Sequence, residues 1–417
     1  MTPVGSAGDV NPFIALGVEL RKRGHDVTVL TSEPFRDTVE SAGLDFGSIL
    51  STAHFERALG DPDLWHPIHG IRALFRLIDR RGMERLWTAI DDRWAEGRSI
   101  LVGHMLSFPT RAYEESRQVP AVTVQLAPIA FRTLHRQPVL PPGIDLDHWP
   151  RPLLRALWWM VDRVGVEPLA RQSLHEFLRS RGLEPDRRLF RSWVHSPRRV
   201  IGFFPDWFAP PQPDWPPQTR LVGFPLFDGF GEPVLDPDLA TWLDEGSPPV
   251  VFAPGSANRQ AERLFSVGAA ATARSGMRAL FVTPWADQLP SPLPGHVRHV
   301  SRAPFSALFP RCAVAVHHGG IGTTAQALRA GVPQVVVGGA FDQPDNGARL
   351  VRLGVGRRIP PFRLKPARLA TVLDDLTGDT GVVEATARYA AHMLKDAGLP
   401  ALERAADEVE AAAGLSG

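Results

Sequence analysis

The sequence predicts an α/β protein made of two consecutive, doubly wound halves that face each other across a cleft. Short apolar runs typical of buried strands alternate with stretches of helical spacing through residues 1–226, and again through residues 249–395. Residues 227–248 separate the two series and are dense in proline, aspartate and glycine, as an inter-domain linker would be. Residues 396–417 are alanine-rich and are predicted to form a C-terminal helical tail.

Length and composition fit two ordinary globular domains. The chain has 417 residues, of which 44% are hydrophobic and 22% charged, and its formal net charge is +1. A chain so close to neutral provides no overall field to attract nucleic acid. The single cysteine, Cys312, cannot form an internal disulfide and fits a cytoplasmic location. No apolar run reaches 18 residues and no secretory leader is recognisable, so no stable membrane insertion is expected.

The N-terminal stretch predicts a loop, a helix and a strand. Residues 1–12 (MTPVGSAGDVNP) are expected to be a glycine-containing loop, followed by a helix that starts at Pro12 and ends near Gly24. Residues 26–31 (DVTVLT) are then a β-rich strand. This order is a βαβ unit without its first strand, so we expect that the chain begins late, through a shifted start codon or a truncation.

The remainder of the first half predicts further strands and two helices. Strands are expected at residues 99–103, 120–125, 200–204 and 220–223. Residues 110–118 are a predicted crossover helix between the first two of these strands. Residues 153–164 (LLRALWWMVDRV) predict a strongly apolar helix. We expect this helix to be buried rather than to lie on a membrane surface, because its flanking charge is modest.

The second half repeats the pattern. A short helix is expected at residues 239–243, within the linker. Strands are expected at residues 250–253, 278–282, 313–316 and 334–337, and helices at 261–275, 323–331 and 343–353.

The most informative stretch is AVHHGGIGTT, residues 315–324. It places a glycine-rich turn between a buried strand and the N-terminus of a helix. Free N–H groups of the turn and the positive end of the helix dipole together favour an anion, and His318 and Thr323 can add side-chain donors. The pattern is neither a P-loop nor the GxGxxG dinucleotide motif. The alternative is a tight turn that packs the helix on the sheet without a ligand.

Three motifs together resemble the nucleotide-sugar glycosyltransferases of the GT-B fold, which consist of two Rossmann-like domains. They are GSAGDVNP at residues 5–12, HHGGIGTTAQALRAGVPQ at 317–334 and FDQPDN at 341–346. The likeness is greatest to bacterial antibiotic, macrolide and rhamnolipid-type enzymes and to sterol glucosyltransferases. It implies an inverting enzyme of secondary metabolism, a monomer or homodimer, that moves a hexose from a UDP- or dTDP-sugar to a hydroxyl of a small hydrophobic acceptor.

The resemblance also assigns the groups that bind the donor's diphosphate. The histidine before the glycines corresponds to His318, with Gly320, Gly322 and Thr323 supplying backbone or hydroxyl donors. Ser256, in the glycine turn after the first strand of the second half, is expected to add another phosphate contact.

Four further residues concern the sugar and the nucleoside. Asp342 and Gln343 correspond to the pair that hydrogen-bonds the sugar hydroxyls, although they could equally begin a helix. Arg302 stands where plant members stack a tryptophan on the base, so the choice between uridine and thymidine stays open. Gln326 stands where those members have a glutamate that binds the ribose.

The predicted general base is Asp9, at a position where antibiotic and sterol-type members resemble this chain in having aspartate. A carboxylate beside the acceptor hydroxyl can remove its proton, while the alternative role is an N-cap for the helix starting at Pro12. His104 follows the strand 99–103, near the aspartate that orients the catalytic histidine of plant relatives. We hypothesise that His104 assists or replaces Asp9.

No cofactor or obligatory metal is expected, because the helix dipole can stabilise the leaving group. The triplets Asp61-Pro-Asp63, Asp145-Leu-Asp147 and Asp236-Pro-Asp238 are interpreted as turns rather than as a metal site. Aromatic residues in the loops of the first half favour a hydrophobic acceptor. Two alternatives stay open: a nucleotide-sugar epimerase of the same architecture, and a non-catalytic auxiliary protein.

Overall fold

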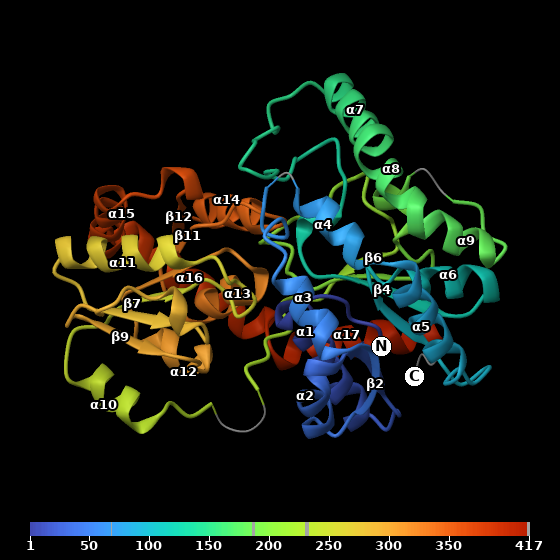
Figure 1. Cartoon of the computed structure of the whole chain (residues 1–417), viewed down its shortest axis with the longest axis horizontal. Helices are drawn as coiled ribbons and strands as arrows, with labels where there is room; N and C mark the ends of the chain where they lie inside the picture. The colour runs from blue at the N-terminus through green and yellow to red at the C-terminus, as the bar shows by residue number, and fades with distance from the viewer. Residues whose placement is uncertain (68, 186–187, 230–232, 415–417) are drawn as a thin grey trace.

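The computed structural model describes the chain except residues 68, 186–187, 230–232 and 415–417. Part of the predicted linker and the end of the predicted tail therefore lie outside the described residues. Parallel strands form two groups, one in each half of the chain, and helices cover both (Figure 1).

The first half contains six strands in parallel pairings, in the orders β1-β2 and β3-β4-β5-β6. The strands are β1 (Thr28–Ser32), β2 (Asp45–Leu50), β3 (Leu101–His104), β4 (Ala121–Gln125), β5 (Val200–Gly202) and β6 (Thr219–Leu221). The helices are α1 (Ala7–Lys22), α2 (Arg36–Ser41), α3 (Thr52–Leu59), α4 (Gly70–Leu77), α5 (Arg80–Asp91), α6 (Phe108–Arg117), α7 (Arg151–Met160), α8 (Glu167–Ala170) and α9 (Glu176–Ser180).

Met1 and Thr2 lie where the first strand of the βαβ unit would stand in the sheet. The Thr2 N–H donates to the Val102 carbonyl at 2.9 Å on one side, and the Leu30 N–H donates to the Met1 carbonyl at 2.8 Å on the other. Thr2 pairs with Gly103 in parallel. These two residues therefore join β1 to β3, so that the two strand groups of the first half form one sheet.

Helix α1 begins at Ala7, five residues earlier than the sequence predicted, so the predicted start at Pro12 is wrong and Asp9 is not the N-cap that was its alternative role. Ser6 is the N-cap, and Asp9 lies in the first turn. The Ser6 N–H and hydroxyl donate to Asp9 Oδ2 at 2.7 and 3.0 Å, which forms a capping box. This contact satisfies free N–H donors at the start of the helix, and Pro12 lies within the helix.

The second half contains a six-stranded parallel sheet in the order β12-β11-β10-β7-β8-β9. The strands are β7 (Val250–Ala253), β8 (Ala279–Val282), β9 (Val297–Val300), β10 (Val314–His317), β11 (Gln334–Val336) and β12 (Gly356–Arg358). The helices are α10 (Pro237–Asp244), α11 (Glu262–Arg274), α12 (Phe305–Leu308), α13 (Ile321–Ala330), α14 (Gln343–Leu353), α15 (Pro366–Gly378), α16 (Thr380–Asp396) and α17 (Leu399–Ala413).

Both faces of the inner strands of this sheet are buried, which is why β7 and β10 are nearly continuous apolar runs. Successive side chains of β7 point to opposite faces. Val250 and Phe252 pack in one core cluster with residues of α11 and α15. Val251 packs in another cluster, together with Leu243 of α10.

The predicted C-terminal tail returns to the first half. Helix α17 lies beside α1 (Figure 1), and Ala405 and Val409 belong to the core cluster that contains Phe13. Arg23 at the end of α1 forms an ion pair with Glu410 at 2.9 Å. The last helix therefore stabilises the half that is furthest from it in sequence.

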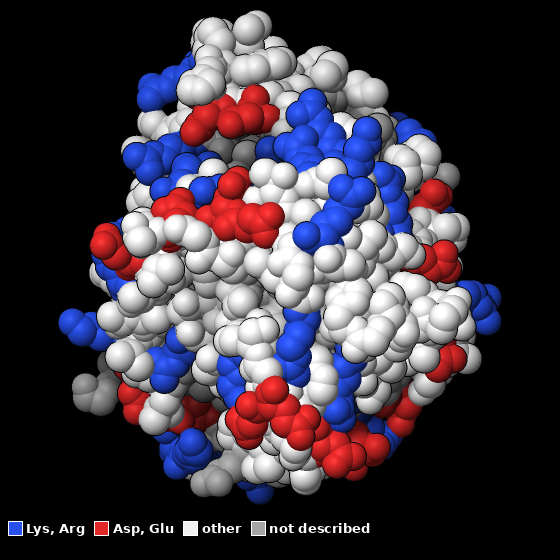
Figure 2. Space-filling model, turned by 90° about the vertical axis from the view of Figure 1, so that its left-hand side faces the viewer, with Lys and Arg blue, Asp and Glu red and all other residues white. Residues whose placement is uncertain are grey.

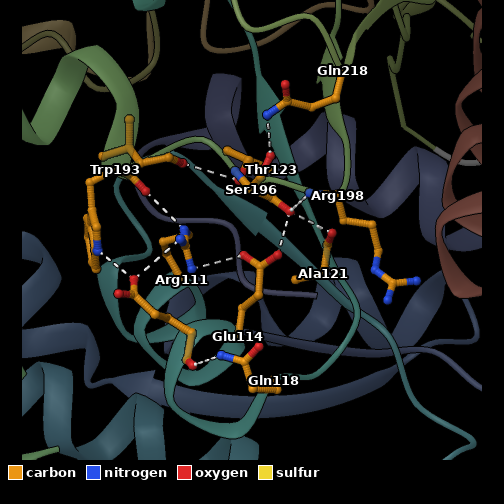
Figure 3. A network of polar contacts seen from close by, with 11 residues as sticks. Arg111, Glu114, Gln118, Ala121, Thr123, Trp193, Ser196, Arg198 and Gln218 are labelled. Carbon is orange, nitrogen blue, oxygen red and sulfur yellow. Dashed lines mark hydrogen bonds and ion pairs between the residues drawn. The ribbon is translucent and has the colours of Figure 1, made fainter. Parts of the chain in front are cut away.

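A buried polar network fixes the helix α6 against β4 and the loop before β5 (Figure 3). The Ser196 hydroxyl donates to Glu114 Oε1 at 2.6 Å, and Arg111 lies 3.4 Å from the other oxygen of this carboxylate. Burial raises the pKa of Glu114, against the opposing effect of Arg111. The network supplies partners for groups that the fold removes from water.

Helix α7 contradicts the prediction of a buried apolar helix. Leu154 is its one buried residue, while Trp159 is 67% exposed and Leu153 55% exposed. The helix continues through wider, π-helical turns at Val161–Val166 into α8. Among the described residues, no helix is both long and apolar enough to cross a bilayer.

Candidate active site

Three loops of the second half meet because the carboxyl ends of β7, β10 and β11 are in register. His317 at the end of β10 lies opposite Ala253 of β7 and Val336 of β11. The loops that follow these strands therefore leave the sheet at one edge, as ligand-binding loops of parallel sheets do. They carry most of the residues that the sequence assigned to the donor site.

The glycine turn after β10 has a backbone that only glycine adopts without strain. Gly319 has φ +94°, and a Cβ on it would lie 2.7 Å from Val336 Cγ1. Gly320 is the N-cap of α13, and a Cβ on Gly322 would meet open space. The N–H groups at the start of α13 therefore face an accessible region, where the helix dipole favours an anion.

His317 fixes this turn, a role that the sequence did not assign. The Gly319 N–H donates to its Nδ1 at 3.1 Å, and its Nε2 lies 2.9 Å from Gln334 Oε1. An Nδ1 that accepts leaves the proton on Nε2, which donates to the glutamine. Burial, together with neighbouring His318, lowers the pKa of His317 to about 3, so its ring is neutral.

His318 packs against the two glycine loops. A Cβ on Gly255 would lie 2.8 Å from its Cε1, and one on Gly320 would lie 2.4 Å from its Nε2. Burial lowers the pKa of His318 to about 4, and a hydrogen bond with the Ala253 backbone opposes this effect. At neutral pH the ring is therefore an uncharged hydrogen-bonding group beside the helix N-terminus.

Asp342 and Gln343 stand at the start of α14, beside the glycine turn. Asn346 Nδ2 donates to Asp342 Oδ2 at 2.7 Å and to the Gly319 carbonyl at 2.8 Å, so Asn346 ties the two loops together. Gln343 Oε1 accepts from the N–H groups of Gly339 and Ala340 at 3.2 Å each. Asp342 and Gln343, the two residues expected to bind the sugar, therefore also hold the loop in place. Asn346 has a structural role that its position in the FDQPDN motif did not indicate.

Two aspartates from different halves of the chain interact at this edge. The pKa of Asp342 is raised to about 7, first because its carboxyl is buried and second because Asp9 places a negative charge nearby. Asp9, in the first turn of α1, is therefore near enough to Asp342 for its charge to act on that carboxyl group. That Asp9 faces the donor across a cleft stays a prediction.

His104 lies behind Asp9, at the end of β3. It is buried, its ring centre lies 6.4 Å from that of Phe13 in an edge-to-face arrangement, and no described residue forms a hydrogen bond with its Nδ1. Burial lowers its pKa, and the charge of Asp9 opposes this effect. His104 and Asp9 are thus electrostatic neighbours, and the hypothesis that His104 assists Asp9 stays a prediction.

The remaining predicted donor contacts differ in exposure. The side chains of Ser256 and Arg302 are exposed, Thr323 is half-buried, and Gln326 is only 6% exposed. Trp285, which the sequence analysis did not single out, donates from Nε1 to the Ser256 carbonyl at 3.0 Å. An aromatic ring is therefore present beside the loop that carries Ser256.

Trp285 is also covered by a cation. The Arg259 guanidinium lies 3.9 Å from the centre of its ring. A cation at this distance occupies the face of the indole. A base that stacked on that face would have to displace Arg259 or stack on the guanidinium itself.

A segment of the first half touches the donor loops. The Trp65 ring lies edge-to-face on Phe341 at 5.9 Å, and Gln260 Nε2 donates to the Pro62 carbonyl at 3.4 Å. Phe341, directly before Asp342, has φ +50°, which is uncommon for a bulky residue. The neighbouring half thus helps to position the loop that presents Asp342.

The three Asp-x-Asp triplets are turns or caps, as predicted. The Asp63 N–H donates to Asp61 Oδ1 at 2.9 Å, and the Asp147 N–H donates to Asp145 Oδ1 at the same distance. Asp236 caps α10. Within the part of the chain that the structure describes, no three His, Cys, Asp or Glu side chains are grouped as metal ligands would be.

Comparison with known proteins gives matches in both halves. Residues 1–89 match the model of the glycosyltransferase family 28 N-terminal domain, and residues 283–405 match that of the erythromycin biosynthesis protein CIII-like C-terminal domain. The O-mycaminosyltylonolide 6-deoxyallosyltransferase of Streptomyces fradiae is 33% identical over 396 residues, which cover 88% of this chain and 86% of that protein.

Solved structures of glycosyltransferases share the arrangement of both halves. The kitacinnamycin glycosyltransferase superposes with a TM-score of 0.74 at 20% identity, covering 99% of this chain and 98% of the other. The spinosyn rhamnosyltransferase SpnG, solved with thymidine diphosphate, gives a TM-score of 0.67 at 19% identity, covering 97% and 98%. The two-domain GT-B architecture predicted from the sequence is confirmed.

Proposed function

The chain belongs to the nucleotide-sugar-dependent hexosyltransferases of the GT-B fold, and on that premise we propose the reaction and the roles of its residues. The protein transfers a hexose from a UDP- or dTDP-sugar to a hydroxyl of a small hydrophobic natural product, with inversion at the anomeric carbon. Residues 249–395 bind the donor and residues 1–226 bind the acceptor. The observation that carries the proposal is the electrostatic interaction of Asp9, in the first turn of α1, with Asp342, which stands beside the glycine turn at the start of α13.

The second half stabilises the leaving group. The diphosphate lies against the N-terminus of α13, with Gly320, Gly322 and Thr323 as donors. The pKa of His318 is lowered to about 4, so its ring is neutral at pH 7 and donates a hydrogen bond rather than a full positive charge. The helix dipole and these donors balance the charge that develops on the departing nucleoside diphosphate.

Asp9 is the general base. Ser6 holds its Oδ2, which leaves Oδ1 to accept a proton from the acceptor hydroxyl. The acceptor oxygen attacks the anomeric carbon, the bond from that carbon to the phosphate oxygen breaks, and the hydroxyl proton passes to Asp9. Asp342 and Gln343 hold the sugar hydroxyls, and His104 supports the charge of Asp9.

The donor nucleoside is tested first by calorimetry with UDP and dTDP. The structural likeness to SpnG, solved with thymidine diphosphate, favours dTDP. His318→Ala is expected to weaken diphosphate binding by about 10- to 100-fold, the loss of one strong hydrogen bond to an anion. Equal binding by the wild type and this variant would contradict the assigned diphosphate site.

Transfer is then measured by mass spectrometry on a panel of phenolic and hydroxy-lipid acceptors. Asp9→Asn is expected to lower kcat by about 10²- to 10⁴-fold with little change in diphosphate affinity. Ser6→Ala is the matched control, because it weakens the helix cap but keeps the carboxylate. If both variants lose the same activity, Asp9 acts through the cap. Isomerisation of the donor without acceptor would instead favour an epimerase.

A further inference from the structure

Asp345, in the first turn of α14, is a buried carboxylate to which the proposed reaction gives no role. Its side chain is 0% exposed, and it lies three residues after Asp342. Asp345 Oδ2 accepts from Arg349 Nε at 2.8 Å, and the Arg349 side chain is only 11% exposed. On the outer end of the second half, by contrast, acidic and basic side chains both lie at the surface (Figure 2). Because a buried ion pair adds little net stability, its further contacts are informative.

Both members of this pair reach the first half of the chain. The other oxygen of the carboxylate, Asp345 Oδ1, accepts from the Val139 N–H at 3.1 Å. Arg349 Nη1 donates to the Phe208 carbonyl at 3.1 Å. Val139 belongs to the long loop after β4, and Phe208 to the loop after β5. The pair therefore joins two loops of the first half to α14 through charge-assisted hydrogen bonds.

The loop after β4 stays close to the second half beyond Val139. A Cβ on Gly143 would lie 3.3 Å from Nη1 of Arg358, in strand β12. Burial lowers the pKa of Arg352, in the last turn of α14, and the charges of Asp147 and Asp145 oppose this effect. The contact at Asp345 is thus one part of a longer junction between this loop and α14.

The start of α14 is also held by residues 62–67 of the first half. The Trp65 ring packs edge-to-face on Phe341, the residue directly before Asp342. A Cβ on Gly70 would lie 3.4 Å from Phe341 Cζ. Phe341 has φ +50°, a conformation that costs a bulky residue free energy and persists only where the surroundings hold it. The first half therefore contacts the chain both before and after the pair Asp342 and Gln343.

We propose that Asp345 and Trp65 are positioning residues for the sugar part of the donor. Asp345 acts through α14 and Trp65 through Phe341, so neither touches the substrate. The inference rests on the proposed function and deepens it, because residues 1–226 then determine how the donor sugar is held as well as binding the acceptor. The diphosphate contacts lie on α13 and its glycine turn, which neither Asp345 nor Trp65 touches. Sugar binding should therefore depend on both halves, and diphosphate binding on the second half.

The test compares the affinities of dTDP and dTDP-glucose by calorimetry, with UDP and UDP-glucose as a second pair. Asp345→Asn is expected to weaken binding of the sugar nucleotide by about tenfold, because a hydrogen bond to a charged group is lost. Binding of the free nucleotide should change by no more than about twofold. A role in stability alone would lower the melting temperature and leave the ratio of the two affinities unchanged.

Trp65→Ala tests the second contact independently and leaves the buried charges intact. It should weaken sugar-nucleotide binding by about 3- to 10-fold, again without changing the affinity for the free nucleotide. Trp65→Phe, which keeps a ring on Phe341, should restore most of the loss. A double-mutant cycle shows whether Trp65 acts through Phe341. The variant that combines Trp65→Ala with Phe341→Ala should bind dTDP-glucose no more weakly than Phe341→Ala alone.

Each variant has a matched control in the first half. Glu114 is also a buried carboxylate beside an arginine, so Glu114→Gln is the control for Asp345→Asn (Figure 3). Trp94 is half-buried, as Trp65 is, but packs on Tyr113 of α6, so Trp94→Ala is the control for Trp65→Ala. Both controls are expected to lower the melting temperature and to keep the wild-type ratio of affinities.

Three outcomes would overturn the inference while the proposed function stands. They are a wild-type ratio of affinities in both Asp345→Asn and Trp65→Ala, equal losses for nucleotide and sugar nucleotide, and additive losses in the double-mutant cycle. A wild-type protein that binds none of the four nucleotides would instead contradict the proposed function, on which the inference depends.

Discussion

The raised pKa of Asp342 makes a quantitative prediction about stability. Its ordinary value is 3.8 and its value in the folded chain is about 7, because of burial and the nearby charge of Asp9. Between these values the folded state binds the proton and the unfolded state does not. Stability from this group is therefore present below about pH 4 and is lost as pH rises to about 7. At about 1.4 kcal/mol per pH unit, the loss is at most about 4 kcal/mol.

The variant Asp342→Asn should remove this dependence, since an amide keeps much of the shape but does not titrate. Urea unfolding of the wild type and the variant at a series of pH values measures the difference between their free energies. The free energy of unfolding of the variant is expected to rise relative to that of the wild type between about pH 4 and pH 7. Above pH 7 the difference should stay constant. A difference that does not change over this interval would refute the assigned titration.

Asp9→Asn provides an independent check on the cause. Removing the negative charge of Asp9 lowers the pKa of Asp342, because that charge is the second of the effects that raise it. The fall in the stability of the Asp9→Asn variant should then end at a lower pH than it does in the wild type. An unchanged curve would mean that burial alone accounts for the raised pKa.

Three further variants test the loops and the core. Gly319→Ala should weaken diphosphate binding by at least about tenfold, because the strained φ and the close contact of the new Cβ with Val336 would move the turn. Wild-type affinity of this variant in calorimetry would contradict the role of Gly319 in the turn. Trp285→Ala should weaken UDP or dTDP binding by about 3- to 10-fold if the indole supports the base, and should not change inorganic diphosphate binding. Glu114→Ala should destabilise the fold by about 1–3 kcal/mol because it leaves Ser196 and Arg111 without their buried partner; an unchanged urea midpoint would contradict this.

The sequence predicted the arrangement of the donor loops well because parallel strands constrain it. The strand 250–253 and the helix 343–353 were predicted with the bounds that the structure has. Once strands, turns and helices were in order, the carboxyl ends of β7, β10 and β11 had to meet. His318 and Asp342 were therefore placed at one edge by topology alone.

Side-chain hydrogen bonds were harder to predict, because they depend on residues that are distant in sequence. His317 and Gln334 are 17 residues apart, and Asn346 reaches a carbonyl 27 residues away. No local pattern indicates such pairs. The early start of α1 was different: Ser6 and Asp9 have capping-box spacing, but Pro12 gave a competing signal for the first turn.

The prediction for α7 failed for another reason. Periodicity shows that a helix has an apolar face, but it does not show whether the chain itself provides anything to cover that face. Met160 and Val164 would look the same in sequence if they were buried. The tertiary structure alone shows that they are exposed.

The two aspartates explain how the site is poised for the proposed reaction. Burial and the negative charge of Asp9 disfavour ionisation of Asp342 and raise its pKa to about 7. Sugar transfer builds positive charge on the ring while negative charge leaves with the diphosphate. If the ring lies beside both carboxyl groups, this positive charge is attracted to them, and α13 stabilises the departing anion. The repulsion between the two carboxylates would then be relieved as the transition state forms, so the interaction favours the transition state over the ground state.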